Sequence, residues 1–185
     1  MESYKNNETV KVDVAHAELV KSLIMCHKPK NILEFGYGGG RVTDKILEAI
    51  SYNQNSPSYS VVDNWLDVGG VIPDGLLEEY KGRAEIITAN EEDFVKNCKI
   101  KFDFIFSDAD HYRTDRWFSS VYSDMLSDNG ILIYHDIDLS GNAMFSNLKE
   151  IYKQTLEKKI KHYLFNKSSL ASERCERGLL VIFKD

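Results

Sequence analysis

The segment EFGYGGG places an acid, Glu34, ahead of three glycines at alternate positions, Gly36, Gly38 and Gly40. Residues without a Cβ permit positive φ and let a ligand lie against the main chain, and a helix that follows such a turn offers unpaired N–H groups. A carboxylate in this place repels a pyrophosphate and suits a ligand with a positively charged amino group. The segment therefore indicates a nucleotide-like ligand that carries a cationic end.

Acids and histidines occur together in two later segments, SDADHY and YHD. The first contains Asp108, Asp110 and His111, and the second contains His135 and Asp136. Three roles stay open for them. Carboxylate oxygens with an imidazole bind a divalent cation that orients and acidifies a substrate hydroxyl. Alternatively, His111 or His135 acts as a general base without a metal, because an imidazole titrates near neutral pH, or Asp108 only holds one end of the ligand and the histidines are structural.

The spacing of the glycines separates this loop from two common nucleotide-binding loops. A dinucleotide fingerprint needs Gly-x-Gly-x-x-Gly, but Arg41 occupies the position of its third glycine. A phosphate-binding loop ends in Gly-Lys-Ser or Gly-Lys-Thr, whereas this chain has Gly40-Arg41-Val42. The pattern that remains after both loops are excluded is an acid followed by spaced glycines. S-Adenosylmethionine (SAM), with its ammonium and sulfonium, has an electrostatic reason to bind there.

The elements that must position these groups alternate along the chain. Short apolar runs predict strands, and apolar residues at helical spacing predict helices. The strands are expected at residues 31–35, 59–63, 84–88, 102–107, 131–135, 161–165 and 179–183, and the helices at residues 12–26, 42–50, 76–80, 91–96, 118–126 and 143–159.

This order predicts an α/β fold: a Rossmann-like, mostly parallel seven-stranded sheet with a C-terminal antiparallel hairpin and helices on both faces. Alternating strands and helices with apolar strands imply a parallel sheet that is covered on both sides. The last two strands follow each other without a helix between them, which favours an antiparallel pair. In an open parallel sheet, ligands bind beyond the carboxyl ends of the strands. The glycine loop and the segments with acids and histidines are therefore expected at one rim.

Length and composition fit one domain. The chain has 185 residues, of which 43% are hydrophobic, so we take residues 1–185 as a single domain with residues 1–30 as an N-terminal helical extension. The net charge of −6 argues against a nucleic-acid partner. No apolar run is long enough to cross a bilayer, and the polar start lacks the core of a signal peptide. We expect no membrane partner and a cytoplasmic location.

The cysteines and the expected hairpin carry two smaller predictions. Cys26, Cys98 and Cys175 are widely spaced and form no C-x-x-C pair, which predicts free thiols. The exposed edge of the hairpin offers unpaired backbone groups to a second copy, so a homo-oligomer is compatible with the sequence.

The glycine segment resembles the first motif of class I SAM-dependent methyltransferases. The segments FDFIFSDADHY and NGILIYHD resemble one subgroup with Asp-x-Asp-His and Gly-x4-His-Asp motifs, which is methyltransferase family 24-like and related to the small-molecule O-methyltransferases. The resemblance covers roughly residues 31–136. It implies SAM as the cofactor and a small molecule as the methyl acceptor.

The resemblance also implies roles for single residues. Glu34 and the glycines bind the methionine and sugar portion, and Asp63 accepts hydrogen bonds from the ribose hydroxyls. Asn90 lies beside the adenine, where an amide oxygen accepts from the adenine amine. By their positions near strand ends, Trp65 and Tyr37 are candidates to stack on or enclose the adenine or the substrate, and Trp65, two places beyond Asp63, is the better candidate for the cofactor. The expected cofactor-binding residues are Glu34, Gly36, Tyr37, Gly38, Gly40, Asp63, Trp65, Asn90, Glu91 and Asp108.

We therefore expect a SAM-dependent methyltransferase that methylates a hydroxyl of a small molecule. Asp108, His111 and His135 are the predicted catalytic residues and handle the acceptor proton. A divalent cation near Asp108, His135 and Asp136 is left open, and no residue is assigned as a metal ligand. Two alternatives remain: a SAM- or nucleoside-binding domain without catalysis that serves as a sensor or assembly partner, and an NAD-binding Rossmann enzyme, which Arg41 and the terminal strand pair disfavour.

Overall fold

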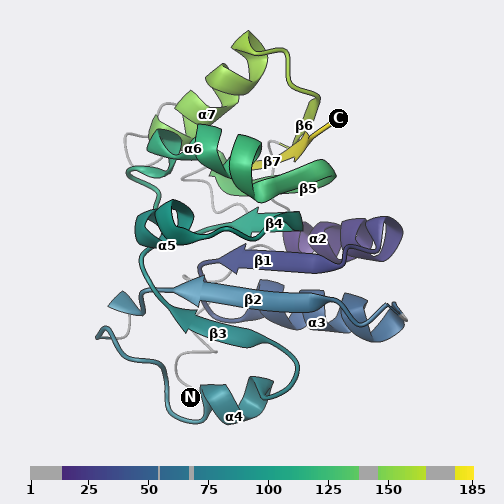
Figure 1. Ribbon diagram of the computed structural model, residues 1–185, viewed down its shortest axis with the longest axis vertical. Helices are drawn as coiled ribbons and strands as arrows, with labels where there is room; N and C mark the ends of the chain where they lie inside the picture. The colour runs from purple at the N-terminus through teal and green to yellow at the C-terminus, as the bar shows by residue number, and fades with distance from the viewer. Residues whose placement is uncertain (1–13, 54, 67–68, 138–145, 166–177) are drawn as a thin grey trace.

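The computed structural model describes residues 14–53, 55–66, 69–137, 146–165 and 178–185. Its strands are β1 (Asn31–Phe35), β2 (Ser58–Asp63), β3 (Glu85–Thr88), β4 (Phe102–Ser107), β5 (Leu126–Ile137), β6 (His162–Phe165) and β7 (Gly178–Phe183). They form one seven-stranded sheet in the order β3-β2-β1-β4-β5-β7-β6 (Figure 1). The pairs among β1 to β5 are parallel, and β7 runs antiparallel to both β5 and β6. The predicted fold class is confirmed.

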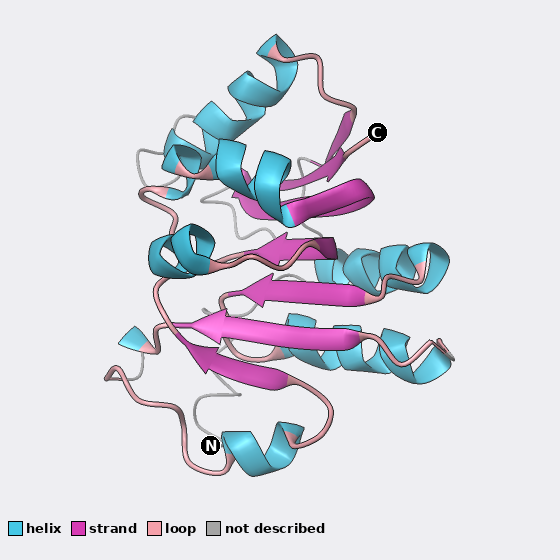
Figure 2. Cartoon of the chain, viewed as in Figure 1, coloured by secondary structure: helices cyan, strands magenta, loops and turns pink. Residues whose placement is uncertain are grey.

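Helices cover both faces of this sheet (Figure 2). They are α2 (Val14–His27), α3 (Arg41–Tyr52), α4 (Leu76–Tyr80), α5 (Glu91–Asn97), α6 (Phe118–Ser120) and α7 (Ser146–Glu157). In Figure 1, α2 and α3 lie behind the sheet, and α5 and α6 lie in front. Neighbouring side chains of a strand point to opposite faces. Ile32 therefore packs in the core with α2 and α3, and Leu33 packs in the core with α5 and α6.

The helix predicted at residues 118–126 is irregular. A 3₁₀ turn (Thr114–Arg116), α6 and a π-helical turn (Val121–Met125) follow one another, and β5 begins already at Leu126. Leu126 pairs with Phe102, and Asn129, with φ of 62°, turns the chain before Ile131 pairs with Phe104. Leu126 fits helical spacing, but pairing with β4 buries it instead. The boundary expected between this helix and β5 is therefore wrong.

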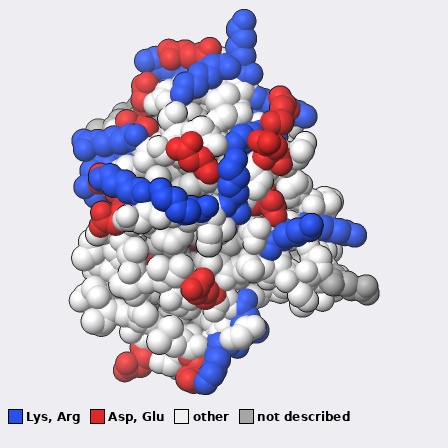
Figure 3. Space-filling view, in the orientation of Figure 1, with Lys and Arg blue, Asp and Glu red and all other residues white. Residues whose placement is uncertain are grey.

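Parts of three predictions lie outside the described residues: the helix starts at residues 12–13 and 143–145, and Cys175. Of the other two thiols, Cys26 is exposed and Cys98 is partly buried, and both are free. Among the described helices, none has the length and apolar character needed to span a membrane. On the face shown in Figure 3, Lys and Arg side chains are intermixed with Asp and Glu side chains.

The carboxyl ends of the parallel strands meet at one rim of the sheet. The arrowheads of β1, β2 and β4 point to the left in Figure 1, and β5 is parallel to β4. At this end of β5, His135 pairs with Leu179 of β7, so β5 has a neighbouring strand on each side. The rim is therefore the place where the loops after β1, β2, β3, β4 and β5 come together.

Candidate active site

The loop between β1 and α3 turns at three glycines with positive φ. The angles are 87° at Gly36, 53° at Gly38 and 77° at Gly40, as the sequence predicts. A Cβ at Gly36 would clash with the backbone oxygen of Asp108, and one at Gly40 would clash with the hydroxyl of Tyr37. The space without a side chain is therefore filled by the protein's own atoms at these two positions, and not left for a ligand.

A pocket opens beside the glycine loop. Its volume is about 200 Å³, counted with the space open to solvent. The lining includes five of the predicted cofactor-binding residues, and Gly40, Asp63, Trp65, Asn90 and Glu91 do not belong to it. The pocket is lined by Glu34, Gly36, Tyr37, Gly38, Gly39, Arg41, Val42, Phe106 and Asp108.

Glu34 is completely buried at the end of β1. Its Oε2 accepts hydrogen bonds from Thr43 Oγ1 (2.9 Å) and from the hydroxyl of Tyr59, whereas its Oε1 has no partner among the described residues. Burial raises the pKa of Glu34 to about 8, although the hydrogen bonds from Tyr59 and Thr43 act in the opposite direction. A buried acceptor without a donor is costly. Beside a pocket, it fits the charged ammonium of a ligand such as SAM.

Asp63 fastens the glycine loop to the turn after β2. Its Oδ2 accepts from the backbone N–H of Tyr37 (2.7 Å), and its Oδ1 accepts from that of Trp65 (2.6 Å). The rings of Tyr37 and Trp65 pack together with centroids 5.7 Å apart, and these residues are only 3% and 1% exposed. Trp65 Nε1 also donates to Thr88 Oγ1 at 3.0 Å. Both rings support the loop, and a contact of the Trp65 ring with adenine stays a prediction.

Asn90 and Glu91, at the start of α5, have different surroundings. Asn90 is exposed, and its Oδ1 accepts from Asn64 Nδ2 at 3.3 Å. Glu91 is buried, and its Oε2 accepts from Thr114 Oγ1 (3.0 Å) and from the backbone N–H of Asp110 (3.3 Å). Burial raises the pKa of Glu91. Glu91 therefore braces the turn after β4, and a contact with the cofactor is a prediction that these hydrogen bonds do not support.

The ends of β4 and β5 bring four of the predicted side chains into one acid–histidine cluster, which consists of Asp108, His111, His135 and Asp136. Asp108 Oδ1 lies 3.2 Å from both His111 Nε2 and His135 Nδ1. Asp136 Oδ2 lies 3.1 Å from His111 Nε2, and Asp136 Oδ1 lies 3.1 Å from His135 Nδ1. Asp110 is not part of this cluster, because its carboxylate pairs with Arg113 at 2.8 Å.

Each histidine of the cluster lies close to both carboxylates, and these carboxylates favour the positively charged form of His111. Burial lowers the pKa of His111, but the hydrogen bonds to Asp108 and Asp136 outweigh it and raise the pKa to about 10. Burial raises the pKa of Asp108, but His135 and His111 lower it well below its usual range. In this state His111 is an imidazolium at neutral pH and donates protons. The role of proton acceptor therefore does not suit His111, and His135 is the other predicted histidine of the cluster.

The cluster also has a donor set that fits a divalent cation. One atom each from Asp108, His135 and Asp136 lies within 4.8 Å of the others. Two carboxylate oxygens and one imidazole nitrogen are ligands found at magnesium, manganese and zinc sites.

One further side chain in contact with the cluster is absent from the sequence-based predictions. His16 of α2 is 3% exposed, and its Nδ1 lies 3.1 Å from His135 Nε2. It belongs to no motif. The available signal was its place beside Ala17 on the apolar side of a predicted helix, where a histidine needs a polar partner.

Comparisons with known proteins show the family and the fold. Residues 33–137 match the family described as methyltransferase domain, and no curated protein matches the chain. The fold is similar to an O-methyltransferase from Bacillus cereus solved in complex with SAH, with a TM-score of 0.75 and 16% identity over 98% of this chain and 86% of that one. It is also similar to a putative caffeoyl-CoA O-methyltransferase from Staphylococcus aureus (TM-score 0.74, 20% identity, covering 100% of this chain and 90% of that one). A third similar structure is TomG from Streptomyces achromogenes in complex with SAM (TM-score 0.74, 11% identity, 96% of this chain and 83% of that one).

Proposed function

Because the chain belongs to the methyltransferase domain family, we propose that it transfers the methyl group of SAM to a hydroxyl of a small molecule. Structures of similar fold are O-methyltransferases, and two of them hold SAH or SAM, which supports this choice. The observation that carries the proposal is the buried Oε1 of Glu34, which has no hydrogen-bond donor in the described part of the chain and belongs to a residue that lines the pocket. An ammonium group of the cofactor supplies the missing donor.

The order of strands supports one direction of the cofactor along the rim. From one edge inward, the strand ends carry Asn90 after β3, Asp63 on β2, Glu34 on β1 and Asp108 after β4. An adenine beside Asn90, a ribose beside Asp63 and a methionine end beside Glu34 follow this same order. In that arrangement the methyl group would lie on the side of β4 and β5. The acid–histidine cluster is where the acceptor would be held.

Methyl transfer requires only two things of the cluster: it positions the acceptor and takes up one proton. Methyl transfer is an in-line displacement at the sulfonium carbon, so holding the acceptor oxygen in line gives most of the rate gain. The acceptor also loses a proton, and His135 is the side chain that we assign to take it, with Asp108 and Asp136 stabilising the resulting charge. A divalent cation held by Asp108, His135 and Asp136 would acidify the acceptor hydroxyl. In either case His111 orients the two carboxylates.

The proposal also covers the domain organisation, the location and the oligomeric state of the protein. We take residues 1–185 as one domain that works in the cytoplasm on a small-molecule acceptor. The edge strand β6, with Tyr163 and Phe165 exposed, is compatible with a homo-oligomer.

Calorimetric titration with SAM, SAH and NAD tests the cofactor. We expect SAM and SAH to bind and NAD to give no heat, and NAD binding without a response to SAM would overturn the proposal. Methyl transfer is then measured with radiolabelled SAM over a panel of catechols, phenols, sugars and amino acids. SAM binding without turnover on the whole panel would favour the sensor alternative.

A further inference from the structure

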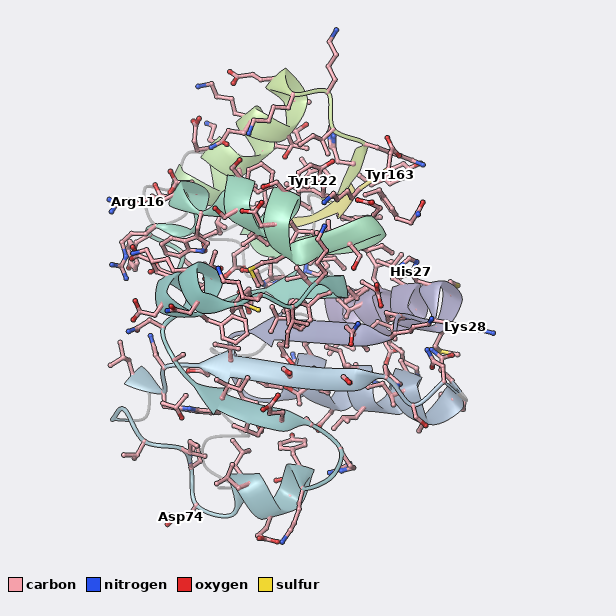
Figure 4. The ribbon with its side chains drawn as sticks, in the orientation of Figure 1. His27, Lys28, Asp74, Arg116, Tyr122 and Tyr163 are labelled. Carbon is pink, nitrogen blue, oxygen red and sulfur yellow. The ribbon has the colours of Figure 1, made fainter. Side chains whose placement is uncertain are left out.

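His16 connects the N-terminal part of the chain to the acid–histidine cluster. It lies in the first turn of α2, and α2 passes behind β1 and β4 in Figure 1. His27, at the other end of the same helix, lies at the right-hand edge of the molecule in Figure 4. The imidazole rings of His16 and His135 meet edge to face, with centroids 5.2 Å apart and planes at 77°. The contact joins residues that are 119 positions apart in the sequence.

The two ring nitrogens of His135 face different partners. Nδ1 faces the carboxylates of Asp108 and Asp136, and Nε2 faces His16 Nδ1 at 3.1 Å. An imidazole ring that is held at both nitrogens has a fixed orientation. Two hydrogen-bonded imidazoles can also divide donor and acceptor roles in either sense, because each ring has two tautomers. His16 therefore accommodates His135 whether Nδ1 carries a hydrogen toward the carboxylates or presents a lone pair.

We propose that His16 is a positioning residue for methyl transfer, and that it holds the ring of His135 so that Nδ1 stays turned toward Asp108 and Asp136. The proposal rests on the proposed function of the cluster. An apolar side chain would fill the place of His16 in the core without the cost of burying a polar ring. The N-terminal helix α2 is thus a component of the active site and more than a cover for the sheet.

Three variants of His16 separate positioning from packing. His16→Asn keeps an amide that donates or accepts close to the position of Nδ1, whereas His16→Leu fills a similar volume without a polar atom. His16→Ala removes both volume and polarity. Val20→Ala is the matched control for packing, because Val20 is fully buried on the same helix and belongs to the hydrophobic core. His27→Asn controls for a histidine substitution on α2 away from the cluster.

The first readout needs no acceptor. Long-range ¹H–¹⁵N spectra of the imidazole groups report the tautomer and environment of His135, assigned with the His135→Ala variant. We expect the His135 nitrogen signals to move in His16→Leu and to return toward their wild-type positions in His16→Asn. Unchanged signals in His16→Leu would overturn the proposal even if the protein binds no SAM.

The second readout is the split between kcat and cofactor affinity. We expect His16→Leu and His16→Ala to lower kcat by about 10- to 100-fold. The Kd for SAM should stay within about twofold, because His16 neither lines the pocket beside the glycine loop nor belongs to the predicted cofactor-binding residues. We expect His16→Asn to recover most of the activity, and Val20→Ala and His27→Asn to keep wild-type kcat. Equal losses in His16→Asn and His16→Leu would show a packing role and reject the proposal. A wild-type protein that fails to bind SAM would instead reject the proposed function.

Discussion

The two halves of the rim handle charge in opposite ways. At the ends of β1 and β2, Glu34 is buried with one oxygen that no described residue pairs, and burial raises its pKa to about 8. At the ends of β4 and β5, carboxylates and imidazoles face one another at 3.1–3.2 Å, and the pKa of His111 is raised to about 10. The first half has an acid without a positively charged partner among the described residues, and a ligand can supply that partner. In the second half, His111 supplies the positive charge. The difference fits the proposed division into a region that binds the cofactor and a region that takes the acceptor proton.

Removing a histidine from the cluster should break the chemistry and leave the binding region intact. We expect His135→Ala to lower kcat by about 10²- to 10⁴-fold, because general base catalysis contributes this much. The Kd for SAM, measured by calorimetry, should change little. His162→Ala is the control, since His162 lies on β6. A loss of SAM affinity as large as the loss of kcat would place His135 in the cofactor site instead.

Neutralising the binding region should have the reverse effect. We expect Glu34→Gln to weaken SAM binding by about 10- to 100-fold, since a hydrogen bond to a charged group contributes about 1.5–3 kcal/mol. Glu48→Gln, which removes a carboxylate on α3 that pairs with Lys21 and Lys45, is the control. A Glu34→Gln variant that binds SAM as tightly as the wild type would contradict the assigned role of Glu34.

The glycine loop joins the two halves, because Gly36 packs against the backbone of Asp108. We expect Gly36→Ala to lower the free energy of unfolding by about 1–3 kcal/mol or more, from positive φ and from the clash together. Gly69→Ala is a matched control, because Gly69 has φ of 85° but no described atom lies within 4 Å of the place that its Cβ would take. Urea denaturation compares the two variants. If both variants lose the same free energy of unfolding, the positive φ alone accounts for the loss, and β1 and β4 tolerate separation at Gly36.

The raised pKa of Glu34 also gives the protein a pH dependence. Between pH 4.5 and about 8 the folded state keeps a proton on Glu34 that the unfolded state has lost, so this group lowers the free energy of unfolding as pH rises. The slope is at most about 1.4 kcal/mol per pH unit. We expect Glu34→Gln to gain stability relative to the wild type over this range and to show no further gain above it. A constant difference in thermal unfolding across the range would mean that Glu34 is ionised throughout.

The same proton affects cofactor binding. A bound ammonium favours the ionised form of Glu34, so wild-type binding of SAM should release a proton below pH 8. Calorimetry in buffers of different ionisation enthalpy measures this release. Glu34→Gln should show none, which separates Glu34 from the titrating groups of the acid–histidine cluster.

Much of the rim could be predicted because it is encoded locally. Each strand end carries its polar residue directly after an apolar run, so Glu34, Asp63 and Asp108 could be placed without knowing the tertiary structure. The parallel order then brings them to one edge. The positive φ at the glycines followed from the same local logic.

Other features depend on tertiary contacts that no local pattern contains. The contact of His16 with His135 spans 119 positions, and Trp65 packs against Tyr37 of the glycine loop and donates a hydrogen bond to Thr88 of β3. The charge of His111 depends on the nearby Asp108 and also on Asp136 of β5, which is 25 positions away. The early start of β5 reflects the pairing of Leu126 with Phe102, which competes with helical spacing. In each case, a partner far away in the sequence decides the outcome.

The position of His135 has a consequence for folding. Its ring meets His16 of α2, and its backbone pairs with Leu179 of β7, so partners on either side of it in the sequence must be in place together. Contacts of such sequence separation form late, because long loops must close first. Activity should therefore return more slowly during refolding than helix content does.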